Sequence, residues 1–420
     1  MATVGKREEK DRMLGRYRAI DLTDEKGHLA GAILSQLGAD VIKVESPEGD
    51  EARTRKPLVD TPGYGKVSLQ WLAYNNSKRD ITLNLEKEEG RQILRRLVAK
   101  AHFLVESYPP GFLDKLGLGY ADLKKINPGL IMASITPFGQ SGPRCQDEAS
   151  DITLMAMGGL MVVTGESDRP PVRVFGEQSY LLASLSAVAA MTIAHHYRSV
   201  AGKGQHIDIS ICECLTSLLT RDIAKWDLQR TMQSRLGSRM QRDKVSTRVL
   251  WRCADGYVVW QMWGGKIGAK ENRSLTLWLK EHGLGEDMEN VLWEKLDMSR
   301  DIQDKIDRWE EDIGKLFGQY HGKELEVEAL KRGVALCRVY GITEVAESEH
   351  LASRGFWSEL YQTEFGAKLR YPGYFFKSSE ADAGIKSGAP MVGEHNEEIY
   401  VGELGLAPSE IEALKRSSVI

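Results

Sequence analysis

Residues 29–45, which read LAGAILSQLGADVIKVE, carry the pattern that decides the fold. Leu29, Ile33, Leu34 and Leu37 recur at helical spacing and predict a helix with one apolar face. Gly38 can end this helix in a left-handed cap. The run from residue 39 to 45 is rich in β-branched side chains and predicts a short strand directly after it.

The alternation of helix and strand continues towards the middle of the chain. Ile81, Leu83 and Leu85 alternate as in a strand, residues 93–101 follow at helical spacing, and residues 103–105 and 130–135 are two further strand patterns. Strands separated by single helices favour right-handed crossovers and a parallel sheet. Ligands of such sheets bind beyond the carboxyl ends of the strands. Those ends are residues 45–50, 106–111 and 136–140.

The second half of the chain predicts a smaller, separate domain. An apolar helix over residues 181–197 and a strand over residues 206–210 still belong to the first pattern. Two strand patterns then flank Ala254-Asp255-Gly256, which is typical of a β-hairpin. Charged helical sequence fills about 270–330, and a last helix is expected from Pro408 to Arg416.

The composition is that of an ordinary globular enzyme. Of the 420 residues 42% are hydrophobic and 28% charged, and the formal net charge is only −4, so neither a nucleic acid nor a membrane partner is expected. The N-terminal MATVGKREEKDR lacks the apolar segment of a signal peptide, and no apolar run is long enough to span a membrane. A cytoplasmic location is therefore expected. Five scattered cysteines form no metal-ligand pattern, so no metal site is expected.

Several common catalytic motifs are absent from the sequence. There is no G-x-G-x-x-G after a strand, no G-x-x-x-x-G-K-[ST] and no G-x-S-x-G. His195 and His196 are adjacent on a helix and cannot bind one metal ion from the same face. A kinase, a serine hydrolase and a zinc enzyme are all unsupported.

Eight short segments, taken in order, resemble the family III CoA-transferases, which include formyl-CoA:oxalate and carnitine CoA-transferases. They are Leu37–Glu45, Asn76–Leu85, Pro110-Gly111, Leu116–Leu118, Asn127-Pro128, Phe138–Pro143, Gly202–Gln205 and Gly388–His395. The resemblance implies an α/β fold with a Rossmann-like large domain built from both chain ends, residues 1–225 and 336–420. A small α+β domain over residues 226–335 and an interlocked dimer of ring-like subunits are also implied.

The resemblance implies a covalent transfer mechanism as well. In the family a carboxylate attacks the donor thioester to give a mixed anhydride, CoA thiolate returns to form an enzyme-bound thioester, and the acceptor acid reverses the steps. That carboxylate is an aspartate at the start of the helix before the glycine turn, commonly in a D-x-x-x-G pattern. Tyr180 stands at this position, with Ser184 in place of the glycine. A tyrosine, with a reference pKa of about 10, is a poor replacement.

Two carboxylates near this position are the catalytic candidates. Glu177 lies three residues before Tyr180, a spacing that keeps side chains on the same helix face; its alternative role is an interaction with the helix dipole. Asp151 aligns by resemblance with an acidic position that lines the family's active site, and it either orients substrate or caps the helix that follows. Racemases of the superfamily need a histidine where Ser150 stands and an aspartate where Tyr180 stands, so a racemase is disfavoured.

The resemblance also indicates where CoA or acyl-CoA would be held as substrate. The expected cradle consists of Asp24, Glu25, Lys26, Gly27, Leu83, Leu85, Ser107, Tyr108 and Lys115. Lys115 lies where a family arginine meets the nucleotide phosphates, and is otherwise a solvated charge. Tyr108 can stack on adenine, with core packing as the alternative.

Three functions are left open by the sequence. The missing aspartate and the opening Asp21–Gly27 resemble the aspartate-lacking subunit of heteromeric benzylsuccinate CoA-transferases. The first hypothesis is therefore a subunit that moves CoA from succinyl-CoA to a small carboxylic acid such as an aromatic succinate, paired with a homologous chain. The second is a self-sufficient homodimer that uses Glu177. The third is a non-catalytic CoA-binding scaffold.

Overall fold

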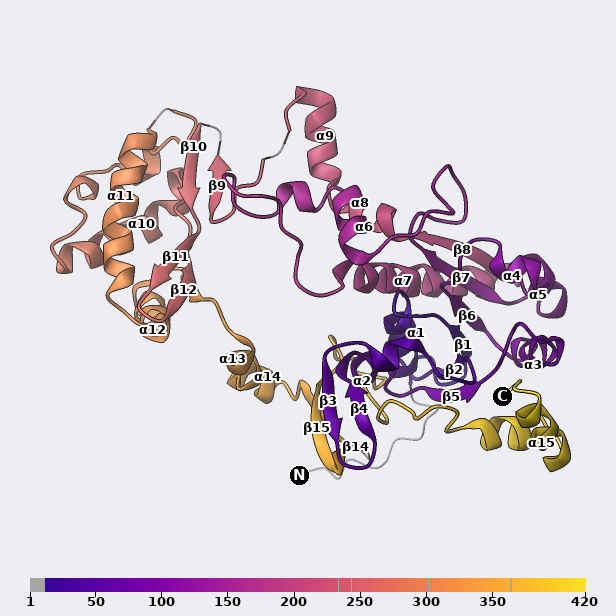
Figure 1. Ribbon diagram of the computed structural model, residues 1–420. Helices are drawn as coiled ribbons and strands as arrows, with labels where there is room; N and C mark the ends of the chain where they lie inside the picture. The colour runs from indigo at the N-terminus through magenta and orange to yellow at the C-terminus, as the bar shows by residue number, and fades with distance from the viewer. Residues whose placement is uncertain (1–11, 233, 243, 301, 363–364) are drawn as a thin grey trace. The chain divides into compact units, whose positions relative to one another are not determined.

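A sheet of six parallel strands forms the centre of the computed structural model, which describes residues 12–420 except 233, 243, 301 and 363–364 (Figure 1). The strand order is β5-β2-β1-β6-β7-β8, and every neighbouring pair is parallel. The bounds are β1 Arg18–Leu22, β2 Asp40–Glu45, β5 Arg79–Thr82, β6 Phe103–Glu106, β7 Ile131–Thr136 and β8 Gln205–Ser210. The expected α/β fold with a parallel central sheet is confirmed.

Helices connect these strands; the apolar spacing predicts three of the four, and the helix Tyr120–Ile126 was not predicted. They are α1 His28–Gln36, α3 Glu88–Val98, α5 Tyr120–Ile126 and α7 Gln178–Ala201. Gly38 has a φ of 109°, the left-handed conformation expected after α1. β5 is shorter than the alternation predicts because it ends at Thr82. Leu83 nevertheless donates its N–H to the Glu45 carbonyl at 2.7 Å, and both Leu83 and Leu85 are buried.

The strand order reverses its direction at β1. From β1 the chain moves outward through β2 to β5, then returns to β6 on the other side of β1 and continues outward to β8. The loops that follow β1 and β6 therefore leave the sheet next to each other, since Leu22 pairs with Glu106 at the carboxyl ends. Such a point of divergence is where open parallel sheets bind ligands.

Shorter elements surround the sheet. Between β2 and β6 they are the 3-10 helix Glu51–Thr54, β3 Leu58–Thr61, β4 Gly65–Ser68 and α2 Leu69–Tyr74. Later ones are α4 Phe112–Lys115, α6 Asp151–Met157, α8 Ile211–Ser217, α9 Thr220–Gln229, α14 Glu349–Ser353, β14 Trp357–Gln362 and β15 Ala367–Pro372.

The C-terminal segment returns to the edge strand β5. A π-helix, Glu398–Glu403, and α15 Pro408–Arg416 follow the Gly388–His395 segment. His395 donates its N–H to the Asp80 carbonyl at 2.9 Å, and the Tyr400 hydroxyl donates to the Thr82 carbonyl at 2.5 Å. The two chain ends therefore build one body, as Figure 1 shows for the indigo strands and the yellow segment.

The described chain divides into two compact units. Unit 1 comprises residues up to 160, 174–227 and 349–420, and unit 2 comprises residues 161–173 and 228–348. Unit 2 thus takes a stretch before α7 and ends later than residue 335. The domain divisions expected from the resemblance stay a prediction.

Unit 2 has a hydrophobic core of its own. Its elements are the 3-10 helix Met161–Val163, β9 Arg239–Arg242, β10 Val245–Arg248, β11 Leu250–Cys253, β12 Gly256–Val259, α10 Gly265–Glu281, the 3-10 helices Glu286–Met288 and Trp293–Lys295, α11 Gln303–Gly318, α12 Gly322–Arg332, β13 Cys337–Arg338 and α13 Ile342–Ala346. β11 and β12 form the predicted hairpin. Five buried tryptophans pack in this core: Trp251, Trp260, Trp278, Trp293 and Trp309.

Candidate active site

The loop after β1 is fixed by a buried ion pair. Thr23 donates its N–H and its hydroxyl to Asp21 Oδ1 at 2.9 and 2.6 Å, and Lys78 Nζ lies 2.7 Å from Asp21 Oδ2. Asp21 and Lys78 are both buried. Burial opposes ionisation of Asp21, yet the charges of Lys78 and Lys43 hold the pKa of its carboxyl below the usual value. The first residues of this loop are therefore held in place by the Asp21 carboxylate.

Two of the expected CoA-binding residues join the loops after β1 and β6. Asp24 donates its N–H to the Ser107 hydroxyl at 2.8 Å, and this hydroxyl donates to Asp24 Oδ1 at 2.8 Å. Lys26 is ion-paired with Asp24. Gly27 has no room for a side chain, because a Cβ there would lie 2.5 Å from Thr23 Cγ2. The loops after β1 and β6 thus form one surface.

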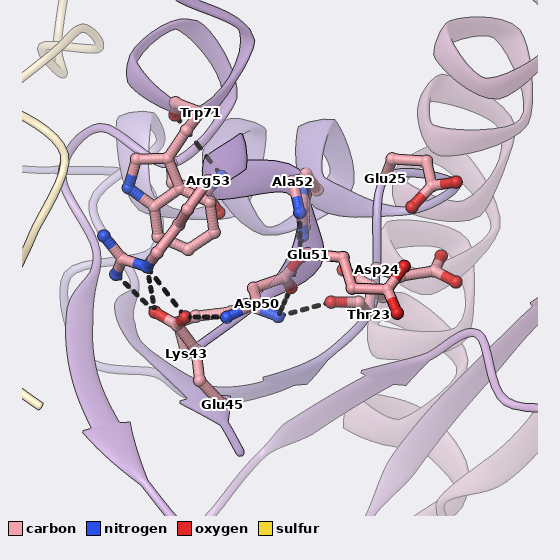
Figure 2. Close-up of polar contacts among 12 residues, drawn as sticks. Thr23, Asp24, Glu25, Lys43, Glu45, Asp50, Glu51, Ala52, Arg53 and Trp71 are labelled. Carbon is pink, nitrogen blue, oxygen red and sulfur yellow. Dashed lines mark hydrogen bonds and ion pairs between the residues drawn. The ribbon is translucent and has the colours of Figure 1, made fainter. Parts of the chain in front are cut away.

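A second buried network lies beneath this surface (Figure 2). Lys43 Nζ donates to the Thr23 carbonyl and lies 3.0 Å from Asp50 Oδ2, which is also 3.0 Å from His28 Nε2. Burial opposes the charge of Lys43, yet Asp50 and Asp21 raise its pKa above the usual range. Burial lowers the pKa of His28, so its ring is neutral near neutral pH. None of these three side chains was among the predicted site residues, although a lysine inside an otherwise apolar strand is a signal that could have found the network.

Tyr180 lies in the first turn of α7 and is only 5% exposed. Burial raises the pKa of its hydroxyl, and the charges of Glu25, Asp151, Glu177 and Asp24 raise it further. The charges of these four carboxylates therefore act on the residue that stands where the family's nucleophile is expected. The hydroxyl stays protonated at neutral pH.

Glu177 is held from the side by residues outside α7. Its Oε2 accepts a hydrogen bond from Gln70 Nε2, and its Oε1 lies 3.8 Å from a guanidinium nitrogen of Arg55. Arg55 also binds Glu25 Oε1 at 2.5 Å. The Glu177 side chain is 30% exposed and makes no capping hydrogen bond to α7. Gln70 and Arg55 come from the region of the β3–β4 hairpin and α2, and no motif in the sequence pointed to them.

Asp151 joins the beginnings of two helices. It is the first residue of α6, which is itself capped by Ser150 in a capping box with Thr153. Asp151 Oδ1 instead accepts from the N–H and the hydroxyl of Ser179 at 3.1 and 2.5 Å. The carboxylate thus caps α7 rather than the helix in which it lies. This contact fixes the first turn of α7, where Tyr180 lies.

The remaining expected CoA-binding residues follow β5 or β6 in the chain. Leu83 and Leu85 are in the hydrophobic core, where the N–H of the intervening Asn84 donates to the Val419 carbonyl at 2.7 Å. Tyr108 stacks on Phe112 with ring centroids 4.7 Å apart, and Lys115 is exposed at the end of α4. Lys115 is therefore available to a phosphate, whereas Lys26, Lys43 and Lys78 are engaged with carboxylates.

Comparison with known proteins gives the same family as the sequence segments. Residues 18–396 match the model of CoA-transferase family III. The chain belongs to this family. It is 32% identical to subunit BbsE of the succinyl-CoA:(R)-benzylsuccinate CoA-transferase of Thauera aromatica, over 96% of this chain and 97% of that one.

Other members of CoA-transferase family III are similar over almost the whole length. The succinyl-CoA–D-citramalate CoA-transferase of Chloroflexus aurantiacus is 29% identical over 94% of both chains. A CaiB/BaiF family protein from Brucella suis superposes with a TM-score of 0.82 at 29% identity, covering 93% of this chain and 99% of the other. The chain is accordingly an acyl-CoA:carboxylate CoA-transferase.

Two further observations describe this family III member. No helix in the described part of the chain is long and apolar enough to cross a membrane. Among the residues that the structure describes, no three His, Cys, Asp or Glu side chains are grouped as a metal site would need. The individual roles of Glu177, Asp151 and the CoA-cradle residues stay predictions.

Proposed function

We propose that this chain is the subunit of a heteromeric CoA-transferase that lacks the catalytic aspartate, working in the cytoplasm with a homologous partner that carries it. The observation behind this proposal is Tyr180, a buried and protonated phenol at the start of α7. A phenol in this state is not a carboxylate nucleophile. The similarity to BbsE, which is named as a subunit of its enzyme, supports the same assignment.

We further propose succinyl-CoA as the donor and an aromatic succinate as the acceptor. Several relatives act on succinyl-CoA by name, with (R)-benzylsuccinate, D-citramalate or glutarate as the second substrate. All three second substrates are dicarboxylic acids. Interlocking of two ring-like subunits is the proposed form of the dimer.

In the proposed reaction the partner's aspartate carboxylate attacks the thioester carbonyl of succinyl-CoA and expels CoA thiolate, which gives a mixed anhydride. The thiolate attacks the aspartyl carbonyl, releases succinate and forms an aspartyl-CoA thioester. The acceptor carboxylate then attacks this thioester, and CoA thiolate returns to the acceptor's acyl carbon, which regenerates the aspartate. Each step exchanges one acyl bond for another, so no thioester is lost provided that water is excluded.

A self-sufficient enzyme that uses Glu177 is the second candidate. Glu177 is partly exposed and is oriented by Gln70 and Arg55, so its carboxylate has access to a substrate and a defined position. A glutamate nucleophile would follow the same sequence of acyl exchanges.

One experiment separates the two candidates. CoA exchange between succinyl-CoA and benzylsuccinate is measured for the chain alone and together with a homologous chain that has an aspartate at the position of Tyr180. Hydroxylamine then traps the acyl-enzyme, and mass spectrometry locates it. We expect activity only in the mixture, with the label on the partner.

The matched variants are Glu177→Gln and, as a control, Asp122→Asn, an exposed carboxylate on α5 that pairs with Lys125. Activity of the chain alone that E177Q abolishes and D122N leaves intact would refute the heteromer and establish the second candidate. A complete lack of exchange in both settings would refute both candidates for this pair of substrates.

A further inference from the structure

Asp50 is the central residue of the buried network in Figure 2. It lies in the loop after β2, and its side chain is 9% exposed. Oδ2 lies 3.0 Å from both Lys43 Nζ and His28 Nε2, and Oδ1 accepts the Ala52 N–H at 2.9 Å. Neither the expected CoA cradle nor the proposed transfer reaction gives Asp50 a role.

The first two of these contacts hold both ends of the loop formed by residues 24–27. Lys43 donates to the carbonyl of Thr23, which precedes the loop, and His28 is the first residue of α1, which follows it. A carboxylate only accepts hydrogen bonds, so the His28 ring donates to Asp50 through Nε2. The start and the end of loop 24–27 are thereby joined through one carboxylate.

The third contact connects Asp50 with the middle of the same loop. Asp50 is the N-cap of the 3-10 helix Glu51–Thr54, and its side chain accepts the N–H of Ala52 in that helix. Arg55 follows this helix directly and binds Glu25 Oε1 at 2.5 Å. The capped helix therefore sets the point from which Arg55 reaches Glu25. Asp50 acts on loop 24–27 at three places.

Asp50 keeps its charge in this buried position. Burial opposes ionisation, yet the charge of Lys43 and the hydrogen bond from His28 hold the pKa of the Asp50 carboxyl well below its usual value. Lys43 is itself only 1% exposed. Opposite charges attract more strongly where water is excluded, so the contact between Asp50 and Lys43 is stronger than an ion pair at the surface.

We propose that Asp50 is a positioning residue for CoA binding. It sets the conformation of loop 24–27, and the loop in turn receives the CoA part of the thioester; this rests on the proposed role of Asp24, Glu25, Lys26 and Gly27 in the CoA cradle. Asp50 acts through these residues and not on the reacting atoms. Its loss therefore raises the KM for succinyl-CoA much more than it lowers kcat.

The test measures the loop and the ligand separately in the full-length chain. Hydrogen–deuterium exchange reports the order of residues 22–28, and isothermal titration calorimetry reports the affinity for CoA. We expect Asp50→Asn to speed exchange in loop 24–27 and to weaken CoA binding by at least about tenfold. Asparagine still caps a helix, so the effect comes from the lost charge rather than from the lost cap.

Glu48→Gln is the matched control for this substitution. Glu48 lies in the same loop after β2, two residues before Asp50, and is exposed. Its carboxylate can therefore be neutralised without touching the buried network. We expect E48Q to match the wild type in loop exchange and in CoA affinity.

A double variant separates positioning from stability. Lys43→Met combined with Asp50→Asn removes both charges, so no buried charge is left unpaired, and such replacements of an ion pair are often tolerated. A purely structural role predicts that CoA binding recovers together with the urea midpoint. The positioning role predicts that CoA binding stays at least about tenfold weaker and the loop stays loose. The double variant decides the matter if D50N fails to fold.

Normal loop exchange in a folded variant would overturn the proposal, and so would a CoA affinity that recovers with stability. A loosened loop with unchanged CoA affinity would overturn it through its premise, because the loop would then not belong to the CoA cradle. A wild-type chain that binds no CoA would refute the proposed function instead. The exchange data would in that case still decide whether Asp50 positions the loop.

Discussion

At the scale of single residues, Tyr180 stands where the family's nucleophilic aspartate is expected but carries a phenol instead of a carboxylate. It lies in the first turn of α7, where the charges of four carboxylates act on its hydroxyl. Its own group is a phenol whose pKa is raised by burial and by those charges. A phenol in this state is unsuited to attack a thioester.

Replacing Tyr180 by Phe tests this interpretation. The variant keeps the ring and removes only the hydroxyl, so we expect the mixed enzyme to retain its rate of CoA exchange within about twofold. The rate is measured with succinyl-CoA and benzylsuccinate under single-turnover conditions. A loss of about a hundredfold with normal folding would show that the hydroxyl takes part in the reaction.

The residues around Tyr180 were predictable only where they follow a pattern along the chain. Glu177 and Asp151 could be proposed because they lie next to the expected nucleophile or align with a family position. Gln70 and Arg55 lie more than 100 residues earlier in the sequence and reach Glu177 only through the folded chain. No periodicity or motif encodes a contact of this kind, so the sequence alone could not identify them.

At the scale of elements, close packing of α1 on β1 depends on Gly31. A Cβ at this position would lie 2.1 Å from Asp21 Oδ2 and 3.0 Å from Lys78 Cε, so the buried ion pair would have to move. We expect Gly31→Ala to lower the free energy of unfolding by about 1–3 kcal/mol, although alanine is the better helix former. Urea unfolding followed by circular dichroism measures the change.

Gly314 in α11 is the matched control for this substitution. A Cβ at Gly314 meets nothing within 4 Å, so alanine should raise the free energy of unfolding by up to about 1 kcal/mol. If both variants changed stability in the same direction, steric contact at Gly31 would not be the cause.

A buried pair of carboxyl groups, Asp80 and Glu45, connects β2, β5 and the C-terminal segment. Burial raises the pKa of Asp80 to about 10, and a hydrogen bond to Glu45 together with its charge contributes. Arg53 binds Glu45 and stacks on Trp71 at 3.8 Å, while Gly393 donates its N–H to Asp80 Oδ1 at 2.6 Å. The pair therefore keeps one proton in the folded protein at neutral pH.

This proton makes the stability depend on pH. In the unfolded chain Asp80 has its ordinary pKa of 3.8, so between about 4 and about 10 the folded state binds one proton more than the unfolded state. The contribution of this extra proton to the free energy of unfolding is complete below the pKa of the unfolded chain. It is lost as the pH rises towards the pKa of Asp80 in the folded protein. Asp80→Asn mimics the protonated acid, so its stability relative to the wild type should increase steadily from pH 5 to pH 9.

Denaturant unfolding of the wild type and D80N across this range measures the difference. Asp122→Asn is again the control and should show no such trend, because Asp122 lies at the surface of α5. A constant difference between D80N and wild type would mean that Asp80 is ionised in the folded protein.

Helices and strands were the most predictable part of the molecule. The boundaries of the α1–β2 stretch, α15 and the β11–β12 hairpin follow from apolar spacing, a terminal glycine or proline, and a turn between two strands. The π-helix at Glu398–Glu403 and the exact end of β5 could not be predicted, because they are set by contacts between the C-terminal segment and β5 rather than by local pattern.

At the scale of the whole molecule, we expect the tryptophan fluorescence of the chain to report mainly the unfolding of unit 2. Five of the nine tryptophans of the chain lie in its core, next to the fully buried Leu275 of α10. We expect Leu275→Ala to destabilise unit 2 by about 2–5 kcal/mol and to shift the tryptophan emission transition to lower urea. Leu277→Ala on the same helix is the control, because Leu277 is 62% exposed and its truncation should change little.

The C-terminal return to β5 has a consequence for how the protein is made. β5 is one edge of the central sheet, and the groups that cover it, from Gly393 to Tyr400, lie within the last 30 residues of the chain. While the ribosome is still translating, this edge and the acid pair beside it stay open to other chains. Removal of residues 393–420 would therefore leave most of the sheet in place with this edge uncovered, and we expect the truncated chain to aggregate.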